Sequence, residues 1–243
     1  MIVFPMAGLS RRFTEAGYSV PKYMLQARGK SVFAHVVGGF SAYFRQLPFL
    51  FILRDVDGSA EFVADELNKL GVTDARLAIL DEVTAGQAET VERGLKRASI
   101  GPDEPLTVFN IDTIRPNFLF PDSFDLKKID GYLEVFRGSG KNWSYVLPVD
   151  PGSDRVAETA EKVPISDLCC TGLYHFGTAG LFLDAYERFN GGLAAEMHLK
   201  ELFVAPMYNL LLKDGRDIRY HVISPDEVMF CGVPSEYEAF CKE

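Results

Sequence analysis

The chain has 243 residues, of which 47% are hydrophobic and 12% aromatic, enough for one substantial packed core. Its formal net charge of -9 makes a broad electrostatic interaction with nucleic acid or an anionic membrane unfavourable, so an anionic ligand would need a local basic pocket. The four cysteines show no C-x-x-C pair and no zinc spacing, and we expect reduced thiols. No basic leader precedes a long apolar segment, and we therefore expect a cytoplasmic protein.

The first stretch, MIVFPMAGLSRRFTEAGYSVPKY, joins an apolar run to a cationic loop. Residues 2–4 are typical of a buried strand, and Pro21 restricts the backbone beside a lysine. Loop N–H groups, a small residue and fixed cations together suit a polyphosphate. The residues concerned are Ala7, Gly8, Leu9, Ser10, Arg11, Arg12 and Lys22. From spacing alone, a basic surface loop is the simpler interpretation, and the rest of the chain has to decide.

Helices and strands then alternate. Ser31 can cap a helix that reaches Phe44, and residues 59–70 form an amphipathic pattern with Gly71 just past its end. The continuous apolar run at 49–53 predicts a buried strand, and residues 75–80 predict another.

A capping-box pattern follows, with Gln87 three residues after Thr84, and predicts a helix from Thr84 towards Ala98. The apolar run at 106–111 predicts a strand that ends at Asp112. Alternating strands and helices indicate a parallel sheet covered on both faces. Because right-handed crossovers bring the carboxyl ends of such strands to one edge, we expect the first loop, the Thr84 region and Asp112 to meet there.

The second half changes character, and its strands and helices alternate less regularly. We expect it to form a mixed sheet that extends the first half, without a linker or an internal repeat. The predicted strands are 131–136, 143–149, 169–176 and 218–223, and the predicted helices are 179–189, 196–213 and 234–242.

Two groups in this arrangement suggest chemistry. A carboxylate directly after a buried strand, as at Asp112, suits Mg²⁺, which prefers hard oxygen ligands and keeps phosphates and waters as the others. The alternative is an aspartate that begins a turn. In AEKVPIS, Lys162 could hold a second phosphate and Glu161 a hydroxyl of an acceptor, whereas an exposed ion pair is the simpler interpretation.

Competing motifs fail on their spacing. Residues 138–141 spell GSGK, but Val135 and Asn142 stand where a phosphate-binding P-loop needs glycine and Ser/Thr, so we interpret GSGK as a hairpin loop. Ser10 lacks the G-x-S-x-G context of a hydrolase elbow. The neighbourhood of Asp112 lacks the D-x-D pair that a glycosyltransferase usually carries.

Taken in order, PMAGLSRRF…PKY, TAGQAETV, FNID, EKVPIS, TGLYHF and CGVPSEYEAF resemble the sugar-phosphate nucleotidylyltransferases, or pyrophosphorylases, over nearly the whole chain. The resemblance implies an α/β nucleotide-diphospho-sugar transferase fold, a Rossmann-like sheet extended by a mixed acceptor-binding part. It implies one domain over 1–243, with a nucleotide-binding half at 1–125 and an acceptor-binding half at 126–243. The start IVFPMAG and the segment FVAPMYNLLLKDG are most similar to a compact branch found in capsule and surface-polysaccharide gene sets.

By position, the resemblance implies that Arg12 grips the β- and γ-phosphates and that Lys22 lies at the α-phosphate. Residues 7–11 would complete the nucleotide loop. The remaining matches are Gly86 and Gln87 for the base, Asp112 for the metal, and Glu161, Lys162, Gly172 and Tyr174 for the acceptor.

Two departures stand out against the family pattern. Ser10 replaces the second glycine of G-x-G-[ST]-R, and Arg11 replaces the hydroxyl residue; if that position needs a positive φ, Ser10 carries strain. Phe230 stands where a second metal aspartate is usual, with Asp226 and Glu227 nearby.

The resemblance therefore implies an enzyme that couples a nucleoside triphosphate to a phosphorylated small molecule, most simply a sugar 1-phosphate, with Mg²⁺ and release of pyrophosphate. A cytidylyltransferase for phosphocholine or another non-sugar phosphate is one alternative. A catalytically inactive nucleotide-binding module is another. The sequence leaves the base, the acceptor and the oligomeric state open.

Overall fold

One nine-stranded mixed sheet runs through both halves of the chain in the computed structural model, which describes residues 1–197 and 199–242. The strands follow the order β10-β9-β11-β6-β1-β4-β5, and β8 and β12 continue from β11. The sheet strands are β1 (Ile2–Pro5), β4 (Phe49–Leu53), β5 (Ala75–Ile79), β6 (Leu106–Phe109), β8 (Gly131–Arg137), β9 (Ser144–Pro148), β10 (Val156–Glu161), β11 (Leu168–Phe176) and β12 (Ile218–Ile223). Two short pairs stand apart: β2 (Gln26–Ala27) with β3 (Lys30–Ser31), and β7 (Thr113–Ile114) with β13 (Met229–Phe230).

The strands of the first half are parallel and buried on both faces. β1 pairs with β4 and β6, and β4 pairs with β5, all in parallel. Along β1, Val3 belongs to one hydrophobic core, whereas Ile2 and Phe4 belong to the other. Continuous apolar runs are what such two-sided burial requires. The predicted α/β architecture is confirmed.

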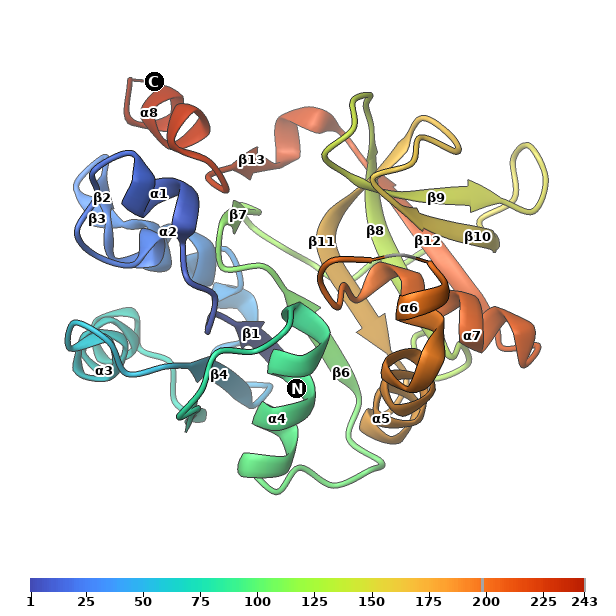
Figure 1. Cartoon of the computed structure of the whole chain (residues 1–243), viewed down its shortest axis with the longest axis horizontal. Helices are drawn as coiled ribbons and strands as arrows, with labels where there is room; N and C mark the ends of the chain where they lie inside the picture. Colours follow the sequence, from blue (N-terminus) through green and yellow to red (C-terminus); the bar gives the residue numbers. More distant parts are fainter. Residues whose placement is uncertain (198, 243) are drawn as a thin grey trace.

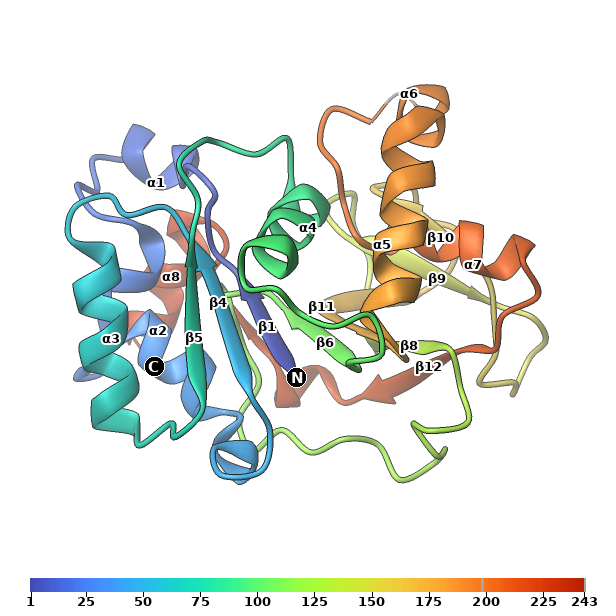
Figure 2. The same ribbon diagram turned by 90° about the horizontal axis from the view of Figure 1, so that it is seen from below.

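Helices cover both faces of this sheet. α2 (Val32–Gly38), α3 (Ser59–Leu70) and α8 (Pro234–Lys242) pack in the core that contains Phe4, whereas α4 (Gln87–Arg97), α5 (Ala179–Arg188) and α7 (Tyr208–Lys213) pack in the core that contains Val3. Figure 2 shows the two groups on opposite sides of β4 and β1. In Figure 1 the C-terminal helix α8 returns to lie near α1 (Arg11–Glu15) and α2. Among the described residues, no helix is long and apolar enough to cross a membrane.

The long strand β11 joins the two halves. β8 follows one edge of β11 at both ends, so the other edge is left to β9, paired at Cys169, and to β6, paired from Leu173 onward. Residues 170–172 therefore lie between the start of β9 and the end of β6. This fork in the sheet opens the space in which the candidate site lies.

Two predicted helix boundaries are wrong. The helix capped by Ser31 starts as expected, with the Ala34 N–H donating to the Ser31 hydroxyl at 3.0 Å, but it ends at Gly38 rather than Phe44. Successive glycines weaken a helix, and a Cβ on Gly39 would lie 2.3 Å from the Arg115 carbonyl oxygen, so the chain turns there. A short 3₁₀ turn at Ser41–Tyr43 follows.

The capping box at Thr84 is also wrong. α4 begins at Gln87, and the Thr84 hydroxyl instead meets that of Thr90 at 2.6 Å. The backbone of Leu202 fixes this loop, because the Ala88 N–H donates to its carbonyl (2.8 Å) and its own N–H donates to Ala85 (2.9 Å).

The predicted helix over 196–213 is largely replaced by other structure. α6 (Ala194–Glu196) is short, a 3₁₀ turn spans Ala205–Met207, and only Tyr208–Lys213 continues as the helix α7. His198 lies outside the described residues. The GSGK segment is a loop but not a hairpin, because the strands that flank it occupy opposite edges of β11.

Candidate active site

A cleft of about 930 Å³ lies at the fork, between the carboxyl ends of β1 and β6 and the start of β9. This volume is in the range of ligand pockets. Every candidate residue that the sequence suggested lines it. They are Ala7, Gly8, Leu9, Ser10, Arg11, Arg12, Lys22, Gly86, Gln87, Asp112, Glu161, Lys162, Gly172 and Tyr174.

The loop after β1 carries the local backbone strain that the sequence suggested. Ser10 has φ 50° and ψ 32°, a left-handed conformation that favours glycine, and it stands at the start of α1. Arg11 and Arg12 follow in the first turn of α1, and both are exposed. The loop therefore presents two exposed cations to the cleft.

Lys22 and Asp112 form an ion pair in the cleft. The Lys22 ammonium donates to Asp112 Oδ2 at 2.5 Å, and the two side chains are 23% and 20% exposed. Pro21, at φ -51°, positions Lys22 at the start of a 3₁₀ turn, Lys22–Met24, and Asp112 follows β6. The predicted meeting of the cationic stretch with the acid at 112 is thus present in the structure.

The usual place of a second metal aspartate holds an aromatic ring. β13 pairs Phe230 with Thr113, and the Cys231 N–H donates to the Asp112 carbonyl at 2.8 Å, so Phe230 lies beside Asp112 in the fold. Neither nearby acid replaces it in the cleft. Glu227 pairs with Arg115 at 3.2 Å and closes a capping box with Ser224, and Asp226 is exposed.

Another carboxylate, which the sequence analysis did not single out, lies closer. Glu236 lines the cleft, and its Oε2 accepts from the N–H groups of Gly232 (2.9 Å) and Val233 (3.2 Å). A Cβ on Gly232 would lie 3.1 Å from Asp112 Oδ2 and 3.6 Å from Glu236 Oε2, so the two carboxylates are neighbours. Glu236 is the third residue of α8, a position where a glutamate commonly accepts from backbone N–H groups at the start of the helix. From the sequence alone it therefore resembles a helix cap rather than a site residue.

The donor set suits a cation that a nucleotide brings with it. Over residues 1–197 and 199–242, no group of three or more His, Cys, Asp and Glu side chains is arranged to hold a metal ion. Mg²⁺ is, however, commonly held by one or two carboxylates together with substrate phosphates. Asp112, in a cleft lined by Arg12 and Lys22, fits that second arrangement.

The end of the cleft at Gly86 is built from close backbone contacts. A Cβ on Gly86 would lie 2.5 Å from the Leu202 nitrogen, so only glycine fits. Gln87 begins α4, and its amide nitrogen donates to the Asn110 side-chain oxygen. The oxygen and the second hydrogen of the Gln87 amide remain to pair with a ligand. Asn110 was missed, since an asparagine at the end of a strand resembles a turn residue.

The end of the cleft at β10 is built around a buried acid. Glu161 ends β10, is only 8% exposed, and accepts from the Ser144 hydroxyl on the neighbouring strand. Burial raises the pKa of the Glu161 carboxyl, while Ser144 and Lys162 oppose the shift. The Lys162 ammonium is 3.7 Å from Glu161 and lies over the Phe203 ring, 4.3 Å from its centroid. Glu161 and Lys162 thus do form an ion pair, but the Glu161 carboxylate in it is buried rather than exposed.

Strain accompanies these residues. The backbone of Lys162 has φ 58°, a left-handed value that is uncommon for a residue other than glycine. Backbone strain of this kind is frequent at functional sites. Gly172 has φ 98°, and a Cβ there would lie 2.3 Å from the Asn110 amide nitrogen. Gly172 thus leaves room for the Asn110 side chain. Tyr174, a buried residue of β11, also lines the cleft.

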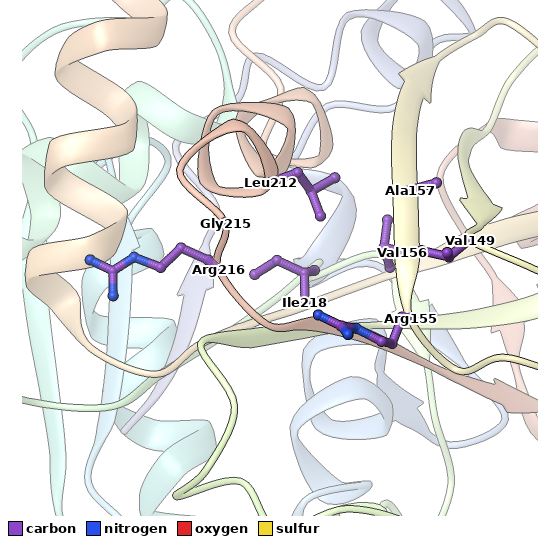
Figure 3. A pocket seen from close by; sticks show the side chains of 8 residues that line it. All are labelled: Val149, Arg155, Val156, Ala157, Leu212, Gly215, Arg216 and Ile218. Carbon is purple, nitrogen blue, oxygen red and sulfur yellow. The ribbon is translucent and has the colours of Figure 1, made fainter.

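A smaller groove of about 350 Å³ lies between β10 and the α7–β12 turn. Figure 3 shows Arg155 reaching towards Ile218, and Arg216 directed away from Val156. Arg155 pairs with Asp217 at 3.7 Å and Arg216 with Asp130 at 3.3 Å. Both arginines thus serve ion pairs of the fold.

Comparisons with known proteins were made for sequence and for structure. No family model and no curated protein sequence matched the chain. Among solved structures, the chain is similar to a nucleoside-diphosphate-sugar pyrophosphorylase from Vibrio cholerae RC9, with 51% identity, 100% of both chains covered and a TM-score of 0.95.

More distant structures share the fold alone. An inositol-1-phosphate CTP transferase from T. maritima has 16% identity, 99% and 94% coverage of this chain and its own, and a TM-score of 0.76. A UDP-glucose pyrophosphorylase from Acinetobacter baumannii has 16% identity, 99% and 91% coverage, and a TM-score of 0.69. From its likeness to the Vibrio cholerae protein over its whole length, the chain belongs to the nucleoside-diphosphate-sugar pyrophosphorylases and is a nucleotidyltransferase.

Proposed function

We propose that the protein transfers a nucleotidyl group from a nucleoside triphosphate to a sugar 1-phosphate and releases pyrophosphate. The observation that carries the proposal is the gathering of two separate cationic groups in one cleft. Arg12 in α1 and Lys22 in the 3₁₀ turn after it line one side of the cleft, and Lys162 lies across the fork beside the buried Glu161. A reaction between two phosphate-bearing molecules needs both groups.

Each residue has a role in this proposal. Arg12 neutralises the β- and γ-phosphates, Lys22 the α-phosphate and Lys162 the acceptor phosphate, while Glu161 accepts from an acceptor hydroxyl. Residues 7–11 cradle the triphosphate with backbone N–H groups, and Gly86 and Gln87 receive the base. Gly172 and Tyr174 shape the acceptor end.

The proposed chemistry is in-line displacement. An oxygen of the acceptor phosphate attacks the α-phosphorus, a new P–O bond forms, and the bond to the β-phosphate oxygen breaks with pyrophosphate as the leaving group. The attacking phosphate is already anionic, so no protein nucleophile or general base is required. The side chains act by positioning the two substrates and by neutralising charge.

We infer that Mg²⁺ accompanies the triphosphate and that Asp112 holds it. The ion would supply charge stabilisation on the phosphate oxygens. In the structure the Lys22 ammonium donates to the Asp112 carboxylate. This contact has to break for Asp112 to hold the ion and for Lys22 to bind the α-phosphate.

The wider assignment also belongs to this proposal. We infer one functional domain, with residues 1–125 binding the nucleotide and residues 126–243 binding the acceptor. A cytoplasmic role in the synthesis of capsule or other surface polysaccharide fits the sequence resemblance. The protein would then work on small molecules rather than on nucleic acid or a membrane.

A second function is favoured by one observation, the aromatic ring of Phe230 at a position that usually carries a metal ligand. A protein that lost this ligand could bind nucleotides without turning them over. Binding of a nucleoside triphosphate with no pyrophosphate released in its presence would support that inactive module.

A pyrophosphate-release screen tests the proposal. The full chain, with Mg²⁺, is incubated with each of the common nucleoside triphosphates and with sugar 1-phosphates, phosphocholine, glycerol phosphate or phospho-amino acids. We expect release with at least one sugar 1-phosphate. Release with phosphocholine alone would select the cytidylyltransferase alternative, and no release with any pair would reject nucleotidyl transfer to these acceptors.

A further inference from the structure

Two aromatic rings from distant parts of the chain meet in the cleft. The rings of Trp143, just before β9, and Phe230, in β13, lie 4.6 Å apart between centroids at an angle of 55°. Both side chains are partly exposed, and both line the cleft. Phe136 in β8 is buried behind them, 5.1 Å from Trp143 and 5.4 Å from Phe230. Together, Trp143 and Phe230 form what we call the aromatic wall.

The backbone ties this wall to the acceptor end of the site. The Lys162 N–H donates to the Trp143 carbonyl at 2.9 Å, and the next residue, Ser144, stands opposite Glu161 in the pairing of β9 with β10. On its other side, Phe230 is paired with Thr113, next to Asp112. The wall therefore lies between the groups proposed to bind the acceptor and the groups proposed to bind the triphosphate.

We propose that the aromatic wall binds the ring of the acceptor sugar phosphate; the inference rests on the proposed function. Aliphatic C–H groups carry a slight positive charge and pack well on the negative face of an aromatic ring, and a sugar ring offers a row of them. Its hydroxyls then face Glu161, Ser144 and Asn142, which also line the cleft.

The charges around the wall favour a sugar over a quaternary ammonium. An aromatic cage for such a cation needs several ring faces around it. Here two partly exposed rings form one side only, and the third ring is only 7% exposed. The buried carboxylate at this end, Glu161, is already next to the Lys162 ammonium, which would repel a second cation, and Glu201 in the cleft lining is exposed to solvent.

The wall also explains the residue at position 230. An aspartate there would place a charge against two aromatic rings, at a cost in desolvation. The phenyl ring instead extends the contact surface for the acceptor.

Trp143 is the one tryptophan of the chain, so tryptophan fluorescence reports on the aromatic wall alone. The full-length protein is titrated with glucose, galactose and mannose 1-phosphates, with phosphocholine and with inorganic phosphate, while tryptophan emission is followed. We expect at least one sugar phosphate to change the emission with a saturable dependence, and inorganic phosphate to leave it unchanged. A response to phosphocholine and to no sugar phosphate would overturn the proposal.

Variants separate contact from folding. Replacing Phe230 with Leu keeps an apolar side chain but removes the ring face, and should raise the KM of the sugar phosphate about five- to tenfold, with the KM of the nucleotide unchanged. Phe230→Tyr should restore binding. Phe120→Leu is the matched control, because Phe120 is also partly exposed within an aromatic cluster but lies outside the cleft.

These measurements test the role of the aromatic wall separately from nucleotidyl transfer itself. If a sugar phosphate is turned over but its binding leaves tryptophan emission unchanged, and Phe230→Leu leaves its KM unchanged, then the wall has no role and nucleotidyl transfer still stands. If no sugar phosphate is bound or turned over, the proposed function and the wall fail together.

Discussion

The Lys22 ammonium lies 2.5 Å from Asp112 Oδ2, although the two residues are 90 positions apart in the chain. The contact joins the loop after β1 to the end of β6, across the line where β1 and β6 pair in parallel. Since both groups are partly exposed, the pair is open to exchange with a bound ligand. Charged groups held ready at the end of parallel strands are what phosphate transfer requires.

Removing the lysine tests its role directly. Lys22→Ala should lower kcat by about a hundredfold or more, the scale on which losing one transition-state contact is measured. The measurement is steady-state pyrophosphate release, with circular dichroism to check folding. Lys30→Ala, an exposed lysine in β3, is the control and should keep full activity. A folded Lys22→Ala protein with normal turnover would refute the assignment.

Replacing Asp112, the partner of Lys22, should change nucleotide binding and turnover in opposite directions. Asp112→Asn removes a negative charge that faces the phosphates, so the nucleoside triphosphate without metal should bind more tightly than it does to the unaltered protein. Turnover with Mg²⁺ should fall by at least about tenfold, because the carboxylate ligand is lost. Calorimetry in the presence of a chelator gives the first quantity. Weaker metal-free binding would contradict this account of Asp112.

A third prediction concerns Asn110, which holds Gln87. In Asn110→Ala the Gln87 amide is free to rotate, so its oxygen no longer faces a single direction. We expect the KM of the preferred nucleotide to rise about tenfold and the preference among bases to weaken, with the KM of the acceptor unchanged. Competition between pairs of nucleoside triphosphates measures the preference. An unaltered preference would show that Asn110 has only a packing role.

These residues illustrate what the sequence could and could not predict. Apolar runs such as 49–53 located the strands of the first half, because burial on both faces leaves a continuous signal. Lys22 and Asp112 were expected to share an edge, since the parallel topology places all strand ends there. Local rules were enough for this part of the site.

Long-range contacts account for the errors. Thr84 and Gln87 fit a capping box, but the Leu202 backbone fixes the loop and moves the start of α4. Residues 199–204 could not be identified as part of this loop, because their pairing spans more than a hundred positions. Asn110 and Trp143 were missed for the same reason, since their importance depends on which distant residues face them.

Backbone strain gives a fourth prediction. Ser10 has φ 50°, which costs an L-residue about 1 kcal/mol, whereas glycine adopts it freely. Ser10→Gly should therefore raise the free energy of unfolding by about 0.5 kcal/mol, after the greater flexibility of glycine in the unfolded chain is subtracted. Thr14→Gly, at an exposed helical position in α1, is the control and should lower stability by about 0.3 kcal/mol, the difference in helix propensity between the two residues. Urea denaturation measures both. A loss of stability in Ser10→Gly would mean that the serine hydroxyl contributes more than its strain costs.

The last prediction concerns a histidine that is not part of the cleft lining. His175 in β11 is 4% exposed, its Nδ1 lies 3.0 Å from the Thr107 hydroxyl, and its Nε2 has no hydrogen-bond partner among the described residues. Burial lowers the pKa of His175 to about 3. The unfolded chain, with an ordinary histidine pKa, therefore takes up a proton at a higher pH than the folded protein does, and stability is lost as the pH falls below that ordinary value.

Between about pH 6.5 and pH 5, this one group should lower the free energy of unfolding by about 1.6 kcal/mol. Urea denaturation at both pH values measures the change, and His175→Gln should remove most of it because glutamine does not titrate. His221→Gln is the control: burial also lowers the pKa of His221, but its side chain is only partly buried in β12, so the variant should keep most of the pH dependence. If His175→Gln loses stability with acid as steeply as the unaltered protein, the acid sensitivity arises from other groups.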